Sequence, residues 1–297
     1  MLKGVFTPIV TVFDEHGEID YDANKKIIER LINEGVDGIL FLGSIGEFFS
    51  FSMEEKMKFI SFAVKTVNKR VKVFIGTGGT VVHEVVALTQ YAENAGADAA
   101  VVISPYYFNL DEESLYRYYS EVASSVSMSI LIYNFPDRTS VNLSPQLIHR
   151  LAKDYKNVIG IKDTVDNISH TRKIIAEVKQ DTKEFSVFSG FDEYFVPNLM
   201  AGGSGIITGL TNIAPKVFVD LYKAFYENDM NTVRELQNKI NILMKLYDIS
   251  QPFISSIKTA VSIMVPGIGT DPRKPFTSCS EQQIEKVKAV LKEAEII

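Results

Sequence analysis

The chain has 297 residues, of which 46% are hydrophobic and 23% are charged, an ordinary composition for a globular protein. Its formal net charge is −6 and it has no basic run, so the sequence gives no sign of a nucleic-acid or membrane-surface partner. The single cysteine, Cys279, cannot form an internal disulfide, and no apolar stretch reaches the roughly 20 residues that span a bilayer. With no signal-peptide pattern at the N-terminus, we expect a soluble, cytoplasmic protein.

Eight short, β-rich runs alternate along the chain with longer segments in which apolar residues recur at helical spacing. The helical segments include Ala23–Asn33, Val85–Ala95, Glu113–Ser124 and Pro145–Ala152. The alternation indicates an α/β fold, a closed parallel (β/α)8 or TIM barrel, because the competing open, doubly wound sheet usually has fewer strands. The expected strands are Val5–Phe13, Gly38–Gly43, Val71–Gly76, Ala99–Ser104, Ser129–Asn134, Val158–Lys162, Phe185–Gly190 and Gly205–Gly209.

After Pro215 the pattern becomes purely helical. The first of these segments is expected to be the last barrel helix, and the others form a C-terminal helical extension. No flexible linker separates the two parts, so we expect residues 1–228 to form the barrel and residues 229–297 to pack on it. The four predicted helices are Val217–Glu227, Thr232–Leu246, Phe253–Val265 and Ser280–Ile297.

Lys162 ends the short apolar run that begins at Val158, which reads as a buried strand of a parallel sheet. Partial desolvation at such a position favours the neutral amine, and a neutral amine is a nucleophile that forms a Schiff base with a carbonyl substrate. Taken alone, the residue is better explained as a lysine that caps a strand and reaches into solvent. The residues at the other strand ends favour the chemical interpretation.

Active sites of such barrels lie at the C-terminal ends of the strands. The segments that follow the expected strands carry a hydroxyl, tyrosines, an arginine and Lys162, a coherent set for carbonyl chemistry. The four histidines are scattered without metal-ligand spacing, so we expect no metal site and no zinc-dependent aldolase. The segments are Gly43–Phe48, Ser104–Tyr107, Tyr133–Thr139, Lys162–Thr164, Ser189–Asp192 and Thr208–Asn212.

Three motifs in this order carry a family resemblance that extends from about Gly4 to Ala260. They are Gly43-Ser44-x-Gly46-Glu47, Tyr133-Asn134-x-Pro136 and Gly160-Ile161-Lys162-Asp163. The chain resembles the dihydrodipicolinate synthase and N-acetylneuraminate lyase family of pyruvate-handling class I (β/α)8 barrels. The resemblance implies a homotetramer built as a dimer of dimers, with a small 2-oxo acid and pyruvate as ligands and no cofactor beyond an imine on Lys162.

The resemblance also implies roles for single residues. Lys162 would form the imine with the keto carbon, Tyr133 would shuttle protons to the reacting centre, and Ser44 would relay them. Tyr107 would complete the relay in a neighbouring subunit. The backbone amides around Ser44-Ile45 would hold the pyruvate carboxylate. The remaining substrate-binding positions are Arg138, Gly190 and Ile207.

Within the family we expect an aldolase that cleaves a 2-keto-3-deoxy sugar acid, with a synthase as the alternative. Synthases carry two threonines where this chain has Ser44-Ile45, and several segments more closely resemble 2-keto-3-deoxygluconate aldolase-like members, which release pyruvate and an aldehyde. Arg138 favours the alternative, a synthase that condenses pyruvate with aspartate semialdehyde, because a guanidinium suits a second carboxylate. A barrel that binds a 2-oxo acid without catalysis is the hypothesis from another class.

Simpler explanations exist for several of these residues. Tyr106 and Tyr107 could be packing aromatics, and Arg138 could be a surface ion-pair residue. Glu47 is better explained as a structural carboxylate that bonds the backbone of its own loop than as a general base. The glycine-rich segments Gly76–Thr80 and Gly202–Gly205 lack the spacing of a nucleotide-binding loop and are expected to be tight turns.

Overall fold

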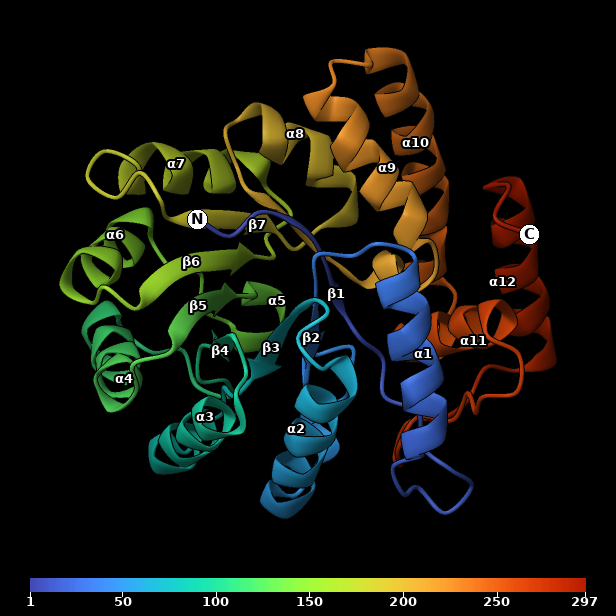
Figure 1. The fold of residues 1–297 in the computed structure, drawn as a ribbon, viewed down its shortest axis with the longest axis horizontal. Helices are drawn as coiled ribbons and strands as arrows, with labels where there is room; N and C mark the ends of the chain where they lie inside the picture. Colours follow the sequence, from blue (N-terminus) through green and yellow to red (C-terminus); the bar gives the residue numbers. More distant parts are fainter.

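The computed structural model describes residues 1–297 and confirms the expected barrel. Eight parallel strands pair in chain order and the last pairs with the first, which closes the sheet (Figure 1). Because parallel strands all run the same way, every strand delivers its C-terminal residues to one rim of the barrel. The strands are β1 Gly4–Pro8, β2 Gly38–Phe41, β3 Lys72–Gly76, β4 Ala99–Ile103, β5 Ser129–Asn134, β6 Val158–Asp163, β7 Ser186–Ser189 and β8 Gly205–Ile207.

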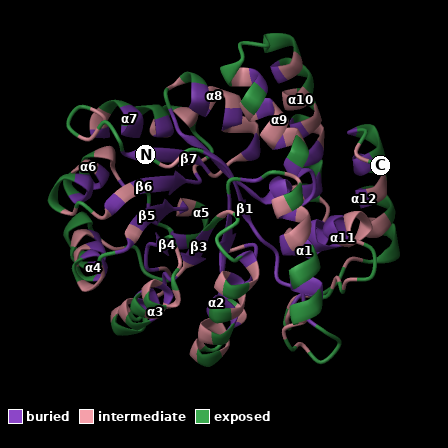
Figure 2. Cartoon of the chain, in the orientation of Figure 1, coloured by how far each residue is buried: buried purple, intermediate pink, exposed green.

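Helices surround the sheet and shield it from solvent (Figure 2). Side-chain caps fix where several of them begin: Ser52 and Glu55 form a capping box at the start of α2, and Ser144 caps α6 ahead of a proline. The short α5, Pro136–Thr139, lies in the loop that follows β5. The outer helices are α1 Tyr21–Asn33, α2 Met53–Val67, α3 Val82–Ala95, α4 Glu112–Ser125, α6 Pro145–Asp154, α7 Ile168–Val178, α8 Phe195–Met200 and α9 Pro215–Tyr226.

The chain continues beyond α9 as a helical extension that packs on one side of the barrel (Figure 1). Helix α10 packs along α9, and a 3₁₀ turn, Met244–Asp248, brings the chain back toward the strand ends. Helix α11 contacts both this turn and the 3₁₀ turn Gly209–Asn212 that follows β8. The helices of the extension are α10 Met230–Leu243, α11 Ile254–Met264 and α12 Glu281–Glu293.

Several expected strands prove too long at their C-terminal ends. The run Val5–Phe13 is buried throughout, but the strand ends at Pro8 and the chain continues as irregular structure. Beyond this point backbone groups find other partners, as when the Val10 N–H donates to the Asn212 side chain. In the run Gly205–Gly209 the strand similarly ends at Ile207, and the 3₁₀ turn begins at Gly209. An apolar run of residues indicates burial, whereas a strand also requires backbone hydrogen bonds to a neighbouring strand.

Aromatic side chains fill the interior of the barrel away from the C-terminal rim. Phe6 stacks on Phe74 with ring centroids 4.5 Å apart and meets the edge of Phe188 at 5.2 Å. Gly38 gives the Phe6 ring its space, since a Cβ at this position would lie 2.5 Å from the ring. These rings pack the barrel interior below the rim at which the strands end.

Candidate active site

A cavity of about 460 Å³ opens at the C-terminal ends of the strands, where the sequence predicts the active site. The loops after β2, β5, β6, β7 and β8 contribute to its wall, and so does the helical extension. The structure brings seven of the eight expected site residues together here. They are Ser44, Ile45, Tyr133, Arg138, Lys162, Gly190 and Ile207.

Lys162 lies in β6, one residue before the strand ends, and is 95% buried since only 5% of its surface is exposed. The strand register places it beside Tyr133 of β5, and its Nζ lies 4.2 Å from the centre of the Tyr133 ring. No carboxylate forms an ion pair with this amine and no side chain or carbonyl accepts a hydrogen bond from it. A buried amine without a counter-charge at a cavity wall is suited to nucleophilic attack on a bound carbonyl group.

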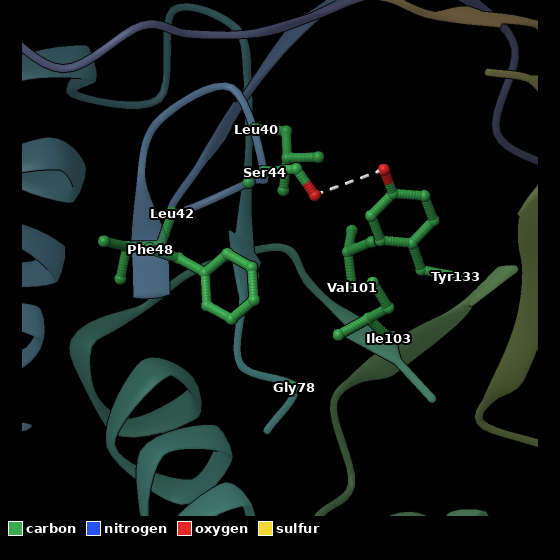
Figure 3. Close-up of a pocket in the computed structure, with 10 residues that line it drawn as sticks. Leu40, Leu42, Ser44, Phe48, Gly78, Val101, Ile103 and Tyr133 are labelled. Atoms are coloured by element: carbon green, nitrogen blue, oxygen red, sulfur yellow. Dashed lines mark hydrogen bonds between the residues drawn. The ribbon is translucent and has the colours of Figure 1, made fainter. Parts of the chain in front are cut away.

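The Tyr133 hydroxyl faces the Ser44 hydroxyl across the end of the barrel (Figure 3). The two oxygens are 3.4 Å apart, which is a long hydrogen bond in which either group can donate. Apolar side chains, among them Leu42 and Val101, line the small hollow beside the pair. Two hydroxyls in contact beside an amine can pass a proton between the reacting centre and the surroundings.

The loop that carries Ser44 is a tight turn that leaves two amides free. Inside it the N–H groups of Gly46, Glu47 and Phe48 bond back to carbonyls of the loop. The N–H groups of Ser44 and Ile45 donate no hydrogen bond within the chain, although both residues line the cavity. Adjacent unpaired amides of this kind bind a carboxylate or another oxyanion.

Glu47 ends this loop in the left-handed conformation, with a φ of 59°, and is completely buried. It is structural, as expected, but the expected contact with its own loop is wrong. One carboxylate oxygen accepts from Lys258 Nζ at 2.8 Å, and the other accepts from the backbone N–H of Arg273 at 2.9 Å. Burial lowers the pKa of Lys258 against the opposing effect of Glu47. The helical extension therefore holds the loop that presents the two free amides.

Arg138 is exposed at the mouth of the cavity and forms no ion pair, so the surface ion-pair explanation is wrong. Its guanidinium lies 5.4 Å from the centre of the Phe135 ring and 5.9 Å from that of Phe253. The one hydrogen bond that it makes, to the Asp137 carbonyl, is long at 3.4 Å. These aromatic contacts hold a cation whose donors are free for an anionic group of a ligand.

Tyr107 is the expected site residue that the single chain does not bring to Lys162. It lies on the loop after β4, is 88% exposed and has a φ of 93°. Its ring packs only against Phe108, which is itself 72% exposed. Tyr106 differs, since its ring turns inward and packs against Phe48. The packing explanation therefore holds for Tyr106 and not for Tyr107.

Comparison with known proteins agrees with this geometry. A family model described as the dihydrodipicolinate synthetase family matches residues 1–294. The chain belongs to this family. It is accordingly an enzyme of the lyase and aldolase type.

Three relatives illustrate where the chain stands in the dihydrodipicolinate synthetase family. YagE of Escherichia coli, a putative 2-dehydro-3-deoxy-D-gluconate aldolase, is 36% identical over 296 residues, which cover 100% of this chain and 98% of YagE. The crystal structure of YagE with pyruvate covers both chains completely, with a TM-score of 0.98. YjhH of the same organism, a probable 2-dehydro-3-deoxy-D-pentonate aldolase, is 37% identical over 97% of this chain and 96% of its own. The 4-hydroxy-tetrahydrodipicolinate synthase of Methanocaldococcus jannaschii is 36% identical over the full length of both.

Two further observations concern membrane-spanning helices and metal-binding groups. No helix of the structure is long and apolar enough to cross a membrane. No three His, Cys, Asp or Glu side chains come together in a group that could bind a metal ion.

Sequence reasoning placed Asp192, Thr164 and Thr208 at this rim without giving them a role, and it missed Tyr247. Asp192 is fully buried, accepts from the Tyr247 hydroxyl at 2.8 Å and from the Leu210 N–H, and has its pKa raised to about 6 by burial. Thr164 and Thr208 also line the cavity, and their hydroxyl oxygens are buried without a hydrogen bond of normal geometry. Tyr247 comes from the extension, 55 residues beyond Asp192, so no local pattern could have paired them.

Proposed function

We propose that this enzyme is a class I aldolase that reversibly cleaves a 2-keto-3-deoxy sugar acid to pyruvate and an aldehyde, through an imine on Lys162. The observation that carries the proposal is the unpaired, buried amine of Lys162 in contact with the Tyr133 ring, beside the Tyr133–Ser44 hydroxyl pair. The names given to YagE and YjhH support the substrate class. No cofactor is needed, because the protonated imine itself accepts electrons.

In the proposed reaction the Lys162 amine adds to the keto carbon, and loss of water gives the protonated imine. Tyr133 takes the proton of the hydroxyl on the fourth carbon as the bond between the third and fourth carbons breaks. The bonding electrons move into the imine, which gives an enamine, and the aldehyde leaves. Protonation of the third carbon and addition of water then release pyruvate and restore the Lys162 amine, while Ser44 passes protons to and from Tyr133.

The rest of the cavity positions the substrate in this proposal. The free amides of Ser44 and Ile45 bind the carboxylate next to the keto carbon. Ile207 forms an apolar wall beside the pyruvate portion. Gly190 lets the Thr164 hydroxyl approach the chain closely, since a Cβ at this position would lie 1.8 Å from that oxygen. A side chain here would displace Thr164 and narrow the cavity.

A synthase that condenses pyruvate with aspartate semialdehyde is the second candidate. The free guanidinium of Arg138 at the cavity mouth favours it, because a second carboxylate would satisfy the unused donors. Ile45 favours the aldolase, since the synthase pattern places a second hydroxyl there. Both enzymes share the imine on Lys162, so they differ in the partner that reacts with the enamine.

We further propose a cytoplasmic homotetramer, a dimer of dimers in which Tyr107 reaches the site of a neighbouring copy. The exposure of the Tyr107 and Phe108 rings supports a subunit contact at this loop. Residues 1–228 and 229–297 would act as one folded unit in each copy. Tyr247 and Phe253 of the extension form part of the cavity wall, which supports a single folded unit.

The test is pyruvate release from 2-keto-3-deoxygluconate, together with borohydride trapping of the pyruvate imine, by the native protein and by K162A. We expect release and trapping on Lys162 in the native protein and neither in K162A, while K216A, which alters an exposed ion pair, behaves as native. Trapping without release, combined with consumption of aspartate semialdehyde, would establish the synthase instead. A ligand-induced thermal shift that persists in K162A, without trapping in either protein, would establish a non-catalytic binding barrel.

A further inference from the structure

His170, near the start of α7, has an acceptor opposite each of its ring nitrogens. Its Nδ1 lies 3.1 Å from Asp163 Oδ2, and its Nε2 lies 3.0 Å from the Leu143 carbonyl oxygen. A neutral imidazole carries one N–H, so it can satisfy only one of these two acceptors. Both contacts are satisfied when a second proton lies between His170 and Asp163, that is, when the pair is a buried imidazolium and carboxylate.

Asp163 is the centre of a wider network. Its side chain is fully buried and also accepts from the Thr171 hydroxyl at 2.7 Å and from Asn134 Nδ2 at 2.9 Å. The side-chain oxygen Oδ1 of Asn134 in turn accepts from the Leu143 N–H, so the network closes on itself. A positive charge beside a buried carboxylate stabilises its ionised form, and His170 is the group in position to supply that charge.

The charges around His170 favour its charged form. Burial lowers the pKa of His170, but the hydrogen bond and the negative charge of Asp163, together with the Leu143 carbonyl, outweigh it and raise the pKa above the ordinary value. Lys173, on the same helix, opposes this effect. Asp163 from β6 and Lys173 from α7 are the charged groups that act on the ring.

The network lies directly behind the reacting residues. The strand register pairs Tyr133 with Lys162 and, one step further, Asn134 with Asp163. Successive residues of a strand point to opposite faces of the sheet, so the first pair faces the cavity and the second faces the helices. The contact between Asn134 and Asp163 therefore fastens together the two strand ends that carry the amine and the phenol.

We propose that charged His170 is a positioning residue of this enzyme, which holds Asp163 and thereby sets the placement of Lys162 against Tyr133. Loss of one proton leaves a ring nitrogen with a lone pair that faces its acceptor, either Asp163 or the Leu143 carbonyl. This breaks one of the two contacts, loosens the strand ends and gives turnover an alkaline limit of its own. The proposal rests on the roles given above to Lys162 and Tyr133. It adds a group that touches neither substrate nor imine.

The protonation state is tested without any turnover. The chain has four histidines, so imidazole signals in NMR spectra are few, and H170N identifies the signal of His170. We expect His170 to titrate above the ordinary value of about 6.5, and to titrate lower in D163N. A signal that titrates at or below the ordinary value in the native protein, or that D163N leaves unchanged, would overturn the proposal.

The positioning role is tested with two variants and a matched control. H170L removes both donors, whereas H170N keeps an uncharged donor toward Asp163. We expect H170L to lower kcat roughly tenfold with little change in KM, and H170N to retain turnover but lose the alkaline limit. The control is H149N, because His149 contacts Glu177 and Asp181 on the outer surface and reaches no strand end.

The outcomes separate this proposal from the proposed function. If pyruvate is trapped on Lys162 but H170L and H170N both keep the native kcat and pH profile, the positioning role is wrong and the aldolase stands. If no imine forms in the native protein, the proposed function fails, and the NMR titration still decides the charge of His170. Should H170L fail to fold, the pH profile of H170N against H149N decides the role.

Discussion

Lys258 Nζ donates a hydrogen bond to Glu47 Oε1 over 2.8 Å, and neither side chain exposes more than 1% of its surface. Lys258 belongs to α11 in the helical extension, whereas Glu47 ends the loop that presents the Ser44 and Ile45 amides. The pair lies between aromatic and backbone groups, with the Phe13 ring 4.7 Å from the ammonium. The extension is thus fastened to the substrate-binding loop by a buried ion pair.

K258M should destabilise the fold strongly, because it leaves the Glu47 carboxylate buried with only one donor. Breaking a buried pair by removing one partner costs about 3–5 kcal/mol in the free energy of unfolding, which denaturant titration measures. The double variant E47Q/K258M should lose less than K258M, since it removes both charges. A double variant that is less stable than K258M would contradict this explanation, and K216A at an exposed pair should change stability little.

The stability of the protein should depend on Asp192 between about pH 4 and pH 6. The pKa of this carboxyl is about 6 in the folded protein and 3.8 for an unperturbed aspartate, the value taken for the unfolded chain. The folded protein therefore binds the proton more tightly. The resulting stabilisation is present below the lower value and is lost as the pH rises through the higher one, a difference of roughly 3 kcal/mol. Urea unfolding at pH 4.5 and pH 7 should show this loss in the native protein and a smaller one in D192N.

Y133F should lower kcat by about 10²- to 10⁴-fold, the range expected when a proton-transfer group is removed. The variant keeps the ring that contacts Lys162 and loses only the hydroxyl that faces Ser44. Steady-state turnover measures the effect, and Y91F serves as the control because the Tyr91 hydroxyl contacts Ser61 on the outer surface. Turnover of Y133F within a few-fold of the native rate would show that another group moves the proton.

R138A should weaken binding of the second substrate and leave the pyruvate imine intact. A hydrogen bond to a charged group contributes about 1.5–3 kcal/mol, so KM for a partner that carries an anionic group should rise roughly ten- to a hundredfold. Borohydride trapping of pyruvate should proceed as in the native protein, because Arg138 lies at the cavity mouth and not beside Lys162. An unchanged KM for both the sugar acid and aspartate semialdehyde would show that Arg138 does not contact substrate.

Much of the fold and site could be predicted because the deciding signals are local. Alternating β-rich and helical segments predict the barrel, and parallel strands necessarily bring their C-terminal residues to one rim. Lys162, Tyr133 and Ser44 each stand at such an end, so their meeting follows from the strand order alone. Strand ends were less predictable: Val5–Phe13 is apolar throughout, yet the ladder stops at Pro8.

The sequence by itself determined the barrel, the strand ends that carry the reacting groups and the family to which they belong. The tertiary structure alone decided which distant groups support them. Lys258 meets Glu47 across 211 residues, and Tyr247 meets Asp192 across 55. His170 lies only seven residues from Asp163, but its second acceptor, Leu143, comes from another loop. Such contacts have no periodicity in the sequence, because they depend on how separately formed elements pack and on the need of each buried polar group for a partner.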